Sequence, residues 1–267
     1  IVNQLVEDNP GFIEALLLQG QLFFYTQNYN DAMTAFERYQ ELQPEDLTIK
    51  LRLANTYIKS KKFDIAEELI DFILKKAPNH ALSNQLKGII RYNNDDFKGA
   101  NYHLEKAIQQ GLSTSANKIL VGISAFQMKN YEQAYYYLNN TKGLLIGNKP
   151  VLKMLAISQL KLGYSIEANE ILLGMNDLSN NDFSLYSAVS SELVRKGQIE
   201  EANMLREKLA DISLNNPVDI ARQGIFKLSM NDIDGITNIE EALALQPNIP
   251  EAKIALAQAY ISNDQLD

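Results

Sequence analysis

The sequence predicts an all-α fold, a solenoid of about seven helix pairs with partial repeats at both ends, and three observations predict it. Six alanines recur with a step of 34 residues, at Ala32, Ala66, Ala100, Ala134, Ala168 and Ala202. A second set of small residues recurs with the same step, at Gly20, Ala54, Gly88, Gly122, Ala156 and Ser190. Pro10, Pro44 and Pro78 are also spaced by 34 residues. A fixed period of this length is typical of stacked helical repeats, in which each repeat contacts its neighbours.

The first full repeat gives the physical reason for each recurring residue. Gly20 allows the two helices of a pair to approach closely, and Ala32 is the small residue where they cross. Phe36 fills the space between this pair and the next one. Pro44 ends the second helix because proline cannot continue a helix. Clusters of Asn, Asp and Gly, such as residues 93–96, mark the turns between paired helices.

The repeat register divides the chain into seven full repeats within one continuous array over residues 1–267. The repeats are residues 13–46, 47–80, 81–114, 115–148, 149–182, 183–216 and 217–249. Each repeat is expected to hold a first helix and a second helix. Residues 1–12 and 250–267 are expected to be partial repeats, the tail of a second helix and a lone first helix. Because neither end carries a polar terminal unit, the chain is interpreted as part of a longer array.

Two segments in this array are poor in helix-forming residues. Residues 142–150 contain two glycines and a proline, and residues 174–182 are rich in Asn, Asp, Ser and Gly. Each segment follows a predicted second helix, and glycine costs up to about 1 kcal/mol relative to alanine inside a helix. The sequence therefore predicts shortened second helices in the fourth and fifth repeats. The acidic excess of the chain also begins near residue 150, so a functional division there is an alternative to one continuous array, although the repeat register runs straight through this point.

The recurring residues resemble a known family. Leu16, Gly20, Phe23, Ala32 and Phe36 follow the tetratricopeptide-repeat pattern, with Leu16 where that pattern usually has tryptophan. The chain resembles this superfamily over its full length, which implies a right-handed α–α superhelix with a concave face. A weaker resemblance, over residues 242–247 and 255–261, is to the tetratricopeptide lipoproteins of the bacterial PEP-CTERM/exosortase system. It implies a periplasmic, envelope-associated adaptor in surface polysaccharide and protein export, and a cytoplasmic location is the alternative.

The resemblance to the tetratricopeptide-repeat superfamily implies which side chains line the concave face. They stand at positions 2, 5, 9 and 12 of each repeat, which in the sixth repeat are Ser184, Ser187, Ser191 and Val194. In the middle of the chain these positions are apolar and predict a peptide-binding strip of Tyr92, Ile119, Ile123, Phe126, Ile157 and Leu160. Such a strip suits an amphipathic helix or an extended apolar segment of a partner. The alternative is that neighbouring first helices pack on each other and bury most of these atoms.

No residue pattern in the chain predicts a catalytic, cofactor-binding or metal site. His80 and His103 have no acidic ligand at helical spacing, and a metal site needs convergent ligands. The glycines at 143 and 147 lack the spacing of a phosphate-binding loop. Paired acids such as Asp95 and Asp96 stand at helix starts, where they favour the positive helix end. We therefore expect a protein without enzymatic activity.

Composition limits the class of partner. The net charge is −8, and the whole excess falls late in the chain: residues 1–149 hold 16 basic and 16 acidic residues, whereas residues 150–267 hold 9 and 17. Nucleic acid is an unfavourable partner for such a surface, because phosphate binding needs clustered Lys and Arg. No stretch has the about 18 consecutive apolar residues of a membrane span, so no direct membrane insertion is expected. The absence of cysteine excludes disulfides and thiolate ligands.

Three functions are consistent with these observations. The first is a non-enzymatic adaptor that holds a protein or peptide on its concave face. The second is the recognition arm of a larger enzyme, such as a glycosyltransferase, whose catalytic domain lies elsewhere. The third is a structural spacer that self-associates through open repeat ends. A repeat array has no single core around which a catalytic pocket forms but offers a long concave surface, which favours the first hypothesis.

Overall fold

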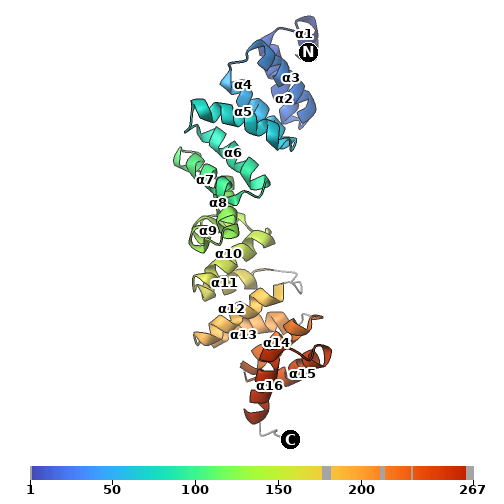
Figure 1. Cartoon of the computed structure of the whole chain (residues 1–267), viewed down its shortest axis with the longest axis vertical. Coiled ribbons are helices and arrows are strands. Elements are labelled where there is room, and N and C mark those ends of the chain that lie inside the picture. Colours follow the sequence, from blue (N-terminus) through green and yellow to red (C-terminus); the bar gives the residue numbers. More distant parts are fainter. Residues whose placement is uncertain (1, 176–181, 211–213, 230, 263–267) are drawn as a thin grey trace. The chain divides into compact units, whose positions relative to one another are not determined.

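The fold is all-α, as the sequence predicts. A computed structural model describes residues 2–175, 182–210, 214–229 and 231–262. These residues form sixteen α-helices, one short 3₁₀ turn and no strand (Figure 1). Among them, no helix is both long enough and apolar enough to span a bilayer.

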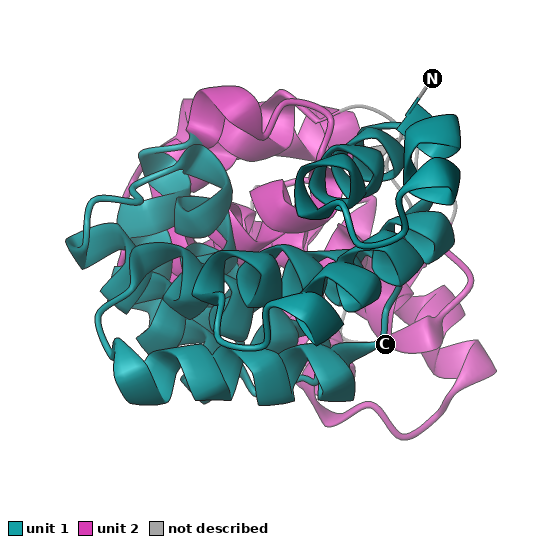
Figure 2. Ribbon diagram, turned by 90° about the horizontal axis from the view of Figure 1, so that it is seen from above, with its two compact units in different colours: residues 1–141 teal, residues 142–267 magenta. Residues whose placement is uncertain are grey.

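The chain divides into two compact units, residues 1–141 and residues 142–267, which are described separately (Figure 2). The helices of unit 1 are α1 (Val2–Asp8), α2 (Ile13–Tyr25), α3 (Tyr29–Leu42), α4 (Leu47–Lys59), α5 (Phe63–Lys76), α6 (Ala81–Asn93), α7 (Phe97–Gln109), α8 (Ser115–Gln127) and α9 (Tyr131–Asn139). Unit 2 contains the 3₁₀ turn η1 (Lys142–Leu144), α10 (Lys149–Lys161), α11 (Ser165–Leu173), α12 (Phe183–Arg195), α13 (Ile199–Ala210), α14 (Pro217–Ser229), α15 (Gly235–Leu245) and α16 (Pro250–Ser262). The interpretation of residues 1–267 as a single array stays a prediction.

Within each unit, helices follow one another as pairs joined by short turns. The first helices of successive pairs begin at residues 13, 47, 81 and 115 in unit 1 and at 149, 183 and 217 in unit 2. Every one of these steps within a unit is therefore 34 residues. The expected helix pairs are present at the expected residues, and α16 begins at Pro250 as a further first helix.

The recurring small residues lie where paired helices meet. All six recurring alanines are fully buried. In unit 1, a β-carbon on Gly122 would lie 2.7 Å from Leu138 Cγ, so α8 and α9 approach too closely for a larger residue. In unit 2, a β-carbon on Gly224 would lie 2.6 Å from the Gly235 carbonyl oxygen. The backbones of α14 and α15 therefore come close together at a glycine pair.

Large apolar side chains fill the spaces between successive pairs. In unit 1, Phe36, Leu53 and Ile70 belong to one buried cluster that extends from α3 to α6. In unit 2, Ile239 and Ile220 pack together in a cluster formed by α14, α15 and α16. Tyr186 on α12 is fully buried, and its hydroxyl donates a hydrogen bond of 2.9 Å to the Leu172 carbonyl. Each unit thus has a core distributed along its stacked helices.

The two segments poor in helix formers have the predicted effect. Helices α9 and α11 are each nine residues long, whereas α3 and α5 have fourteen. The predicted shortening of these second helices is therefore confirmed. The boundary between the two units falls at residues 141 and 142, where the first of these segments begins. In the second segment, residues 176–181 lie outside the described residues.

Candidate functional site

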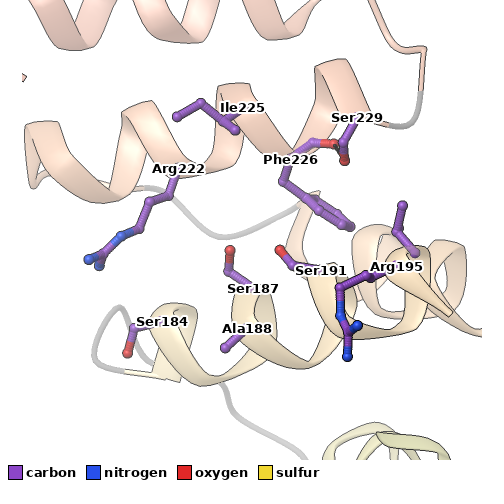
Figure 3. A pocket seen from close by; sticks show the side chains of 10 residues that line it. Ser184, Ser187, Ala188, Ser191, Arg195, Arg222, Ile225, Phe226 and Ser229 are labelled. Carbon is purple, nitrogen blue, oxygen red and sulfur yellow. Dashed lines mark hydrogen bonds between the residues drawn. The ribbon is translucent and has the colours of Figure 1, made fainter. Parts of the chain in front are cut away.

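The candidate site is a hollow in unit 2 between α12 and α14, the first helices of two successive repeats (Figure 3). Its volume is about 530 Å³. Helix α12 contributes Ser184, Ser187, Ala188, Ser191, Val194 and Arg195, and α14 contributes Arg222, Ile225, Phe226 and Ser229. Ser184, Ser187, Ser191 and Val194 are the concave positions that the repeat register assigns to the sixth repeat.

A row of three serines forms the α12 side of the hollow. Ser184, Ser187 and Ser191 are spaced by three and four residues, which places them on one helix face. The hydroxyls of Ser187 and Ser191 point toward α14 (Figure 3). Only 8% of Ser187 is exposed, and its hydroxyl has no hydrogen bond within the described part of the chain. The wall therefore offers small side chains with free hydrogen-bonding capacity.

The opposite side and one end of the hollow are apolar. The Phe226 ring projects from α14 toward α12 (Figure 3), and Phe226 is 4% exposed. Ile225 and Val194 line the same hollow and are half-buried. An apolar surface beside convergent polar groups is the usual composition of a binding pocket.

Two arginines stand at the edges of the hollow, and their surroundings differ. Arg195 makes two hydrogen bonds to Glu192, of 2.8 and 2.6 Å, and its guanidinium points away from α14 (Figure 3). These hydrogen bonds hold the pKa of the Glu192 carboxyl below its usual value. Arg222 has a single ion pair of 3.2 Å to Asp219, on its own helix. The guanidinium of Arg222 therefore keeps more donors for another partner than that of Arg195.

The hollow continues at both ends within unit 2. On one side, Ser184 and Arg222 also line a hollow of about 530 Å³ that includes Asn215, Asn216 and Val218. On the other side, Ile225 and Ser229 also line a hollow of about 410 Å³ that extends to α16. Because each outer hollow shares two residues with the central one, the three hollows lie next to one another along α12, α14 and α16, and together they are called the serine groove.

The predicted apolar strip divides between the two units. Tyr92, Ile119, Ile123 and Phe126 lie in unit 1, and Ile157 and Leu160 lie on α10 in unit 2. In unit 1, the Tyr92 ring packs edge-to-face on Phe97 at a centroid distance of 5.9 Å. The Phe126 ring packs in the same way on Tyr131 at 6.0 Å.

Part of this strip is buried. Ile123 is 8% exposed, whereas Tyr92, Ile119, Phe126, Ile157 and Leu160 are half-buried. The first helices α4, α6 and α8 of unit 1 contact one another in sequence, which contributes to this burial. The strip as a single peptide-binding surface stays a prediction.

Residue types at the concave positions predict the apolar strip and do not predict the serine groove. The sequence feature that indicates the groove is the three serines at the concave positions of the sixth repeat. The equivalent positions of the third and fourth repeats hold mostly larger residues: Leu82, Gln85, Ile89, Ala116, Ile119 and Ile123. Small residues at such positions leave space between neighbouring first helices. Size, more than hydrophobicity, therefore locates the groove.

Comparisons with known sequences support the repeat assignment for part of the chain. Residues 23–90 match the family model described as tetratricopeptide repeat. No curated protein matches the chain in sequence.

Comparisons with solved structures show the fold. The chain is similar to Naa15/Naa10 bound to HypK-THB, with 16% identity and a TM-score of 0.58, over 92% of this chain and 38% of that one. It is also similar to the MamA protein, with 15% identity and a TM-score of 0.51, over 76% of this chain and 97% of that one. A tetratricopeptide repeat protein from Parabacteroides merdae has 14% identity and a TM-score of 0.49, over 92% and 98% of the two chains. The chain thus spans well under half the length of the first of these.

Proposed function

We propose that the chain is a non-enzymatic scaffold that binds a peptide segment of a protein partner. The proposal is based on two findings: residues 23–90 match tetratricopeptide repeats, and the chain has the tetratricopeptide-repeat fold. The segment binds in the serine groove, along the first helices of the last repeats. Stacked helical repeats commonly use such a surface to hold a partner.

The main evidence for this proposal is that both polar and apolar side chains line the groove. Hydroxyls of α12 without partners in the described residues lie across from the Phe226 ring (Figure 3), and Ile225 also lines the hollow. A peptide backbone supplies donors and acceptors for the hydroxyls, and one of its side chains occupies the apolar part. A groove of this kind accepts a peptide without a change in the backbone of the scaffold.

The groove's chemistry favours binding over catalysis. A serine nucleophile needs an adjacent general base within hydrogen-bond reach. In the described residues, no hydrogen bond joins Ser184, Ser187 or Ser191 to a histidine or a carboxylate. These hydroxyls are therefore suited to hydrogen bonding with a bound chain.

A display experiment tests the proposal. Random nonapeptides displayed on phage are selected on the immobilised protein, and the recovered peptides are measured by fluorescence anisotropy on two variants. Ser191→Trp fills the groove and is expected to abolish binding, whereas Glu207→Trp places the same side chain at an exposed site on α13 and is expected to leave binding unchanged. Circular dichroism checks that both variants keep their helicity.

Two outcomes contradict the proposal. In one, no peptide is recovered. In the other, the recovered peptides bind Ser191→Trp as tightly as they bind the parent protein. The envelope location and the role in export implied by the weaker resemblance stay predictions.

A further inference from the structure

We propose that the peptide held in the serine groove is an extended segment with an acidic residue two positions from a large apolar residue. This inference rests on the proposed function and adds the chemistry of the bound segment. The serine row, the apolar surface around Phe226 and the Arg222 guanidinium each define one of its properties.

The serine row favours an extended main chain. A hydroxyl both donates and accepts hydrogen bonds, so it can pair with either the N–H or the C=O group of a peptide. Ser187 is 8% exposed, points into the groove and has no hydrogen bond within the described residues. This hydroxyl is therefore free to pair with a ligand. A bound backbone group supplies the missing partner.

The small size of the serines also sets how close the segment can come. An extended chain places successive residues about 3.3 Å apart, with side chains alternating between its two faces. The row from Ser184 to Ser191 rises about 10 Å along α12, since an α-helix rises about 1.5 Å per residue. About three residues of an extended peptide therefore lie along the row.

The apolar surface selects one large side chain of this segment. Phe226 projects into the groove (Figure 3), and Val194 and Ile225 also line it. A leucine, isoleucine or phenylalanine placed there removes its own apolar surface, and that of the half-buried Val194 and Ile225, from water. Removal of apolar surface from water is the main favourable contribution to binding. A polar side chain at this point would lose hydration without gaining a hydrogen bond from Phe226, Val194 or Ile225.

Arg222 provides the charge for the acidic residue. Its only ion pair in the described residues is the single contact to Asp219, and both groups are partly exposed. A guanidinium has five N–H donors in a planar fork that fits a carboxylate. Arg222 therefore can bind a second carboxylate while its contact to Asp219 persists.

The positions of Arg222 and Phe226 fix the spacing between the two features. They are four residues apart on α14, which corresponds to a rise of about 6 Å. Two residues of an extended chain span about 6.6 Å. An acidic residue bound at Arg222 therefore stands two positions from the apolar residue bound at Phe226.

Lys253 supplies a matched control. It is exposed on α16 and lines none of the three hollows that make up the serine groove. Replacing Lys253 by glutamine changes the net charge of the protein as much as replacing Arg222 does. A difference between the two variants therefore reports the local contact and not the overall charge.

The test begins with the phage-displayed nonapeptides and ends with a synthetic pair. Peptides whose binding is lost in Ser191→Trp are sequenced, and we expect Asp or Glu to be enriched two positions from Leu, Ile or Phe. A fluorescein-labelled peptide of this class and its Asp→Asn (or Glu→Gln) counterpart are then measured by anisotropy. We expect the acidic peptide to bind about fivefold more tightly, as for a partly exposed ion pair. Arg222→Gln should remove this preference, and Lys253→Gln should retain it.

The outcomes separate this inference from the proposed function. If groove-dependent peptides are recovered without the acidic residue, or if Arg222→Gln leaves the preference unchanged, the inference is wrong and the scaffold function stands. If no recovered peptide depends on the groove, both are wrong. Circular dichroism and thermal unfolding of Arg222→Gln and Lys253→Gln confirm that each comparison uses folded protein.

Discussion

Gly88 on α6 lies directly against Leu104 on α7: a β-carbon on Gly88 would be 2.6 Å from Leu104 Cγ and 3.1 Å from the Leu104 backbone nitrogen. Leu104 is fully buried, so it has no free space into which it can move. Gly122 and Leu138 repeat the same contact 34 residues later. The absence of a side chain at this position is therefore what allows the two helices of a pair to pack so closely.

Gly88→Ala is expected to destabilise the protein. Alanine favours the helix by about 1 kcal/mol over glycine, but overpacking of a tight contact costs about 1–3 kcal/mol. We expect the packing penalty to prevail, with a net loss of about 1 kcal/mol in the free energy of unfolding by urea. Gly143→Ala is the control, because a β-carbon on Gly143 meets no atom within 4 Å. A Gly88→Ala protein more stable than the parent would show that helix propensity decides at this site.

Ala100→Leu tests the other recurring position of the same repeat. Ala100 is fully buried on α7, and three added carbon atoms have no space there. Overpacking is expected to cost about 1–3 kcal/mol, measured as a lower midpoint of urea unfolding. Lys98→Leu introduces the same side chain at an exposed position of α7 and should leave the midpoint nearly unchanged. Equal midpoints for the two leucine variants would refute the assigned helix crossing.

The sequence was sufficient to predict the helices but not the groove, for a physical reason. The first helix of each full repeat begins at a predicted residue because Ala32 and its equivalents are tied to the backbone crossing of each pair. The groove depends on which side chains leave space between neighbouring first helices. The repeat pattern predicts that Ser184, Ser187 and Ser191 lie on the concave face, but the depth of the hollow depends on how α12 and α14 pack. The 34-residue period of the sequence does not show how deep this hollow is.

The turns between paired helices share a backbone conformation that their residue types do not indicate. One residue in each turn has a positive φ, at Gln27, Lys61, Asp95, Lys129, Gly163, Gly197 and Asn231. These positions are all 34 residues apart, yet only two of them are glycines. The left-handed conformation costs a residue with a β-carbon about 1–2 kcal/mol. Four different non-glycine residue types carry this strain, so the turn conformation could not be predicted from the sequence alone.

Substitutions at these turns are expected to change stability in opposite directions. Lys129→Gly relieves the strain at φ 60° and should stabilise the protein by about 0.5–1 kcal/mol after the added freedom of the unfolded chain is subtracted. Gly197→Ala imposes the strain at φ 75° and should destabilise it by about 1 kcal/mol. No atom lies within 4 Å of a β-carbon on Gly197, so packing does not contribute. Thermal unfolding of both variants measures the two shifts, and shifts of the same sign would contradict the explanation.

His103 on α7 should make stability depend on pH below neutrality. Its Nδ1 atom is 3.0 Å from Asn84 Oδ1. Burial, followed by the nearby cations Lys87, Arg91 and Lys106, lowers its pKa from the usual value of 6.5. A histidine whose folded pKa is depressed binds its proton more readily in the unfolded chain. Its contribution to stability is therefore present above pH 6.5 and is lost as the pH falls through the folded pKa.

His103→Gln isolates this contribution, because glutamine keeps an amide donor for Asn84 and does not titrate. We expect the urea midpoint of the parent protein to fall more between pH 7.5 and pH 5 than that of the variant, since a proton bound to His103 in the folded state is disfavoured by burial and by Lys87. The carboxylates titrate in both proteins, so their effect cancels in the comparison. Parallel pH profiles of the two proteins would show that His103 has the same proton affinity in the folded and unfolded chains. That outcome would contradict the lowering of its pKa by burial and by the nearby cations.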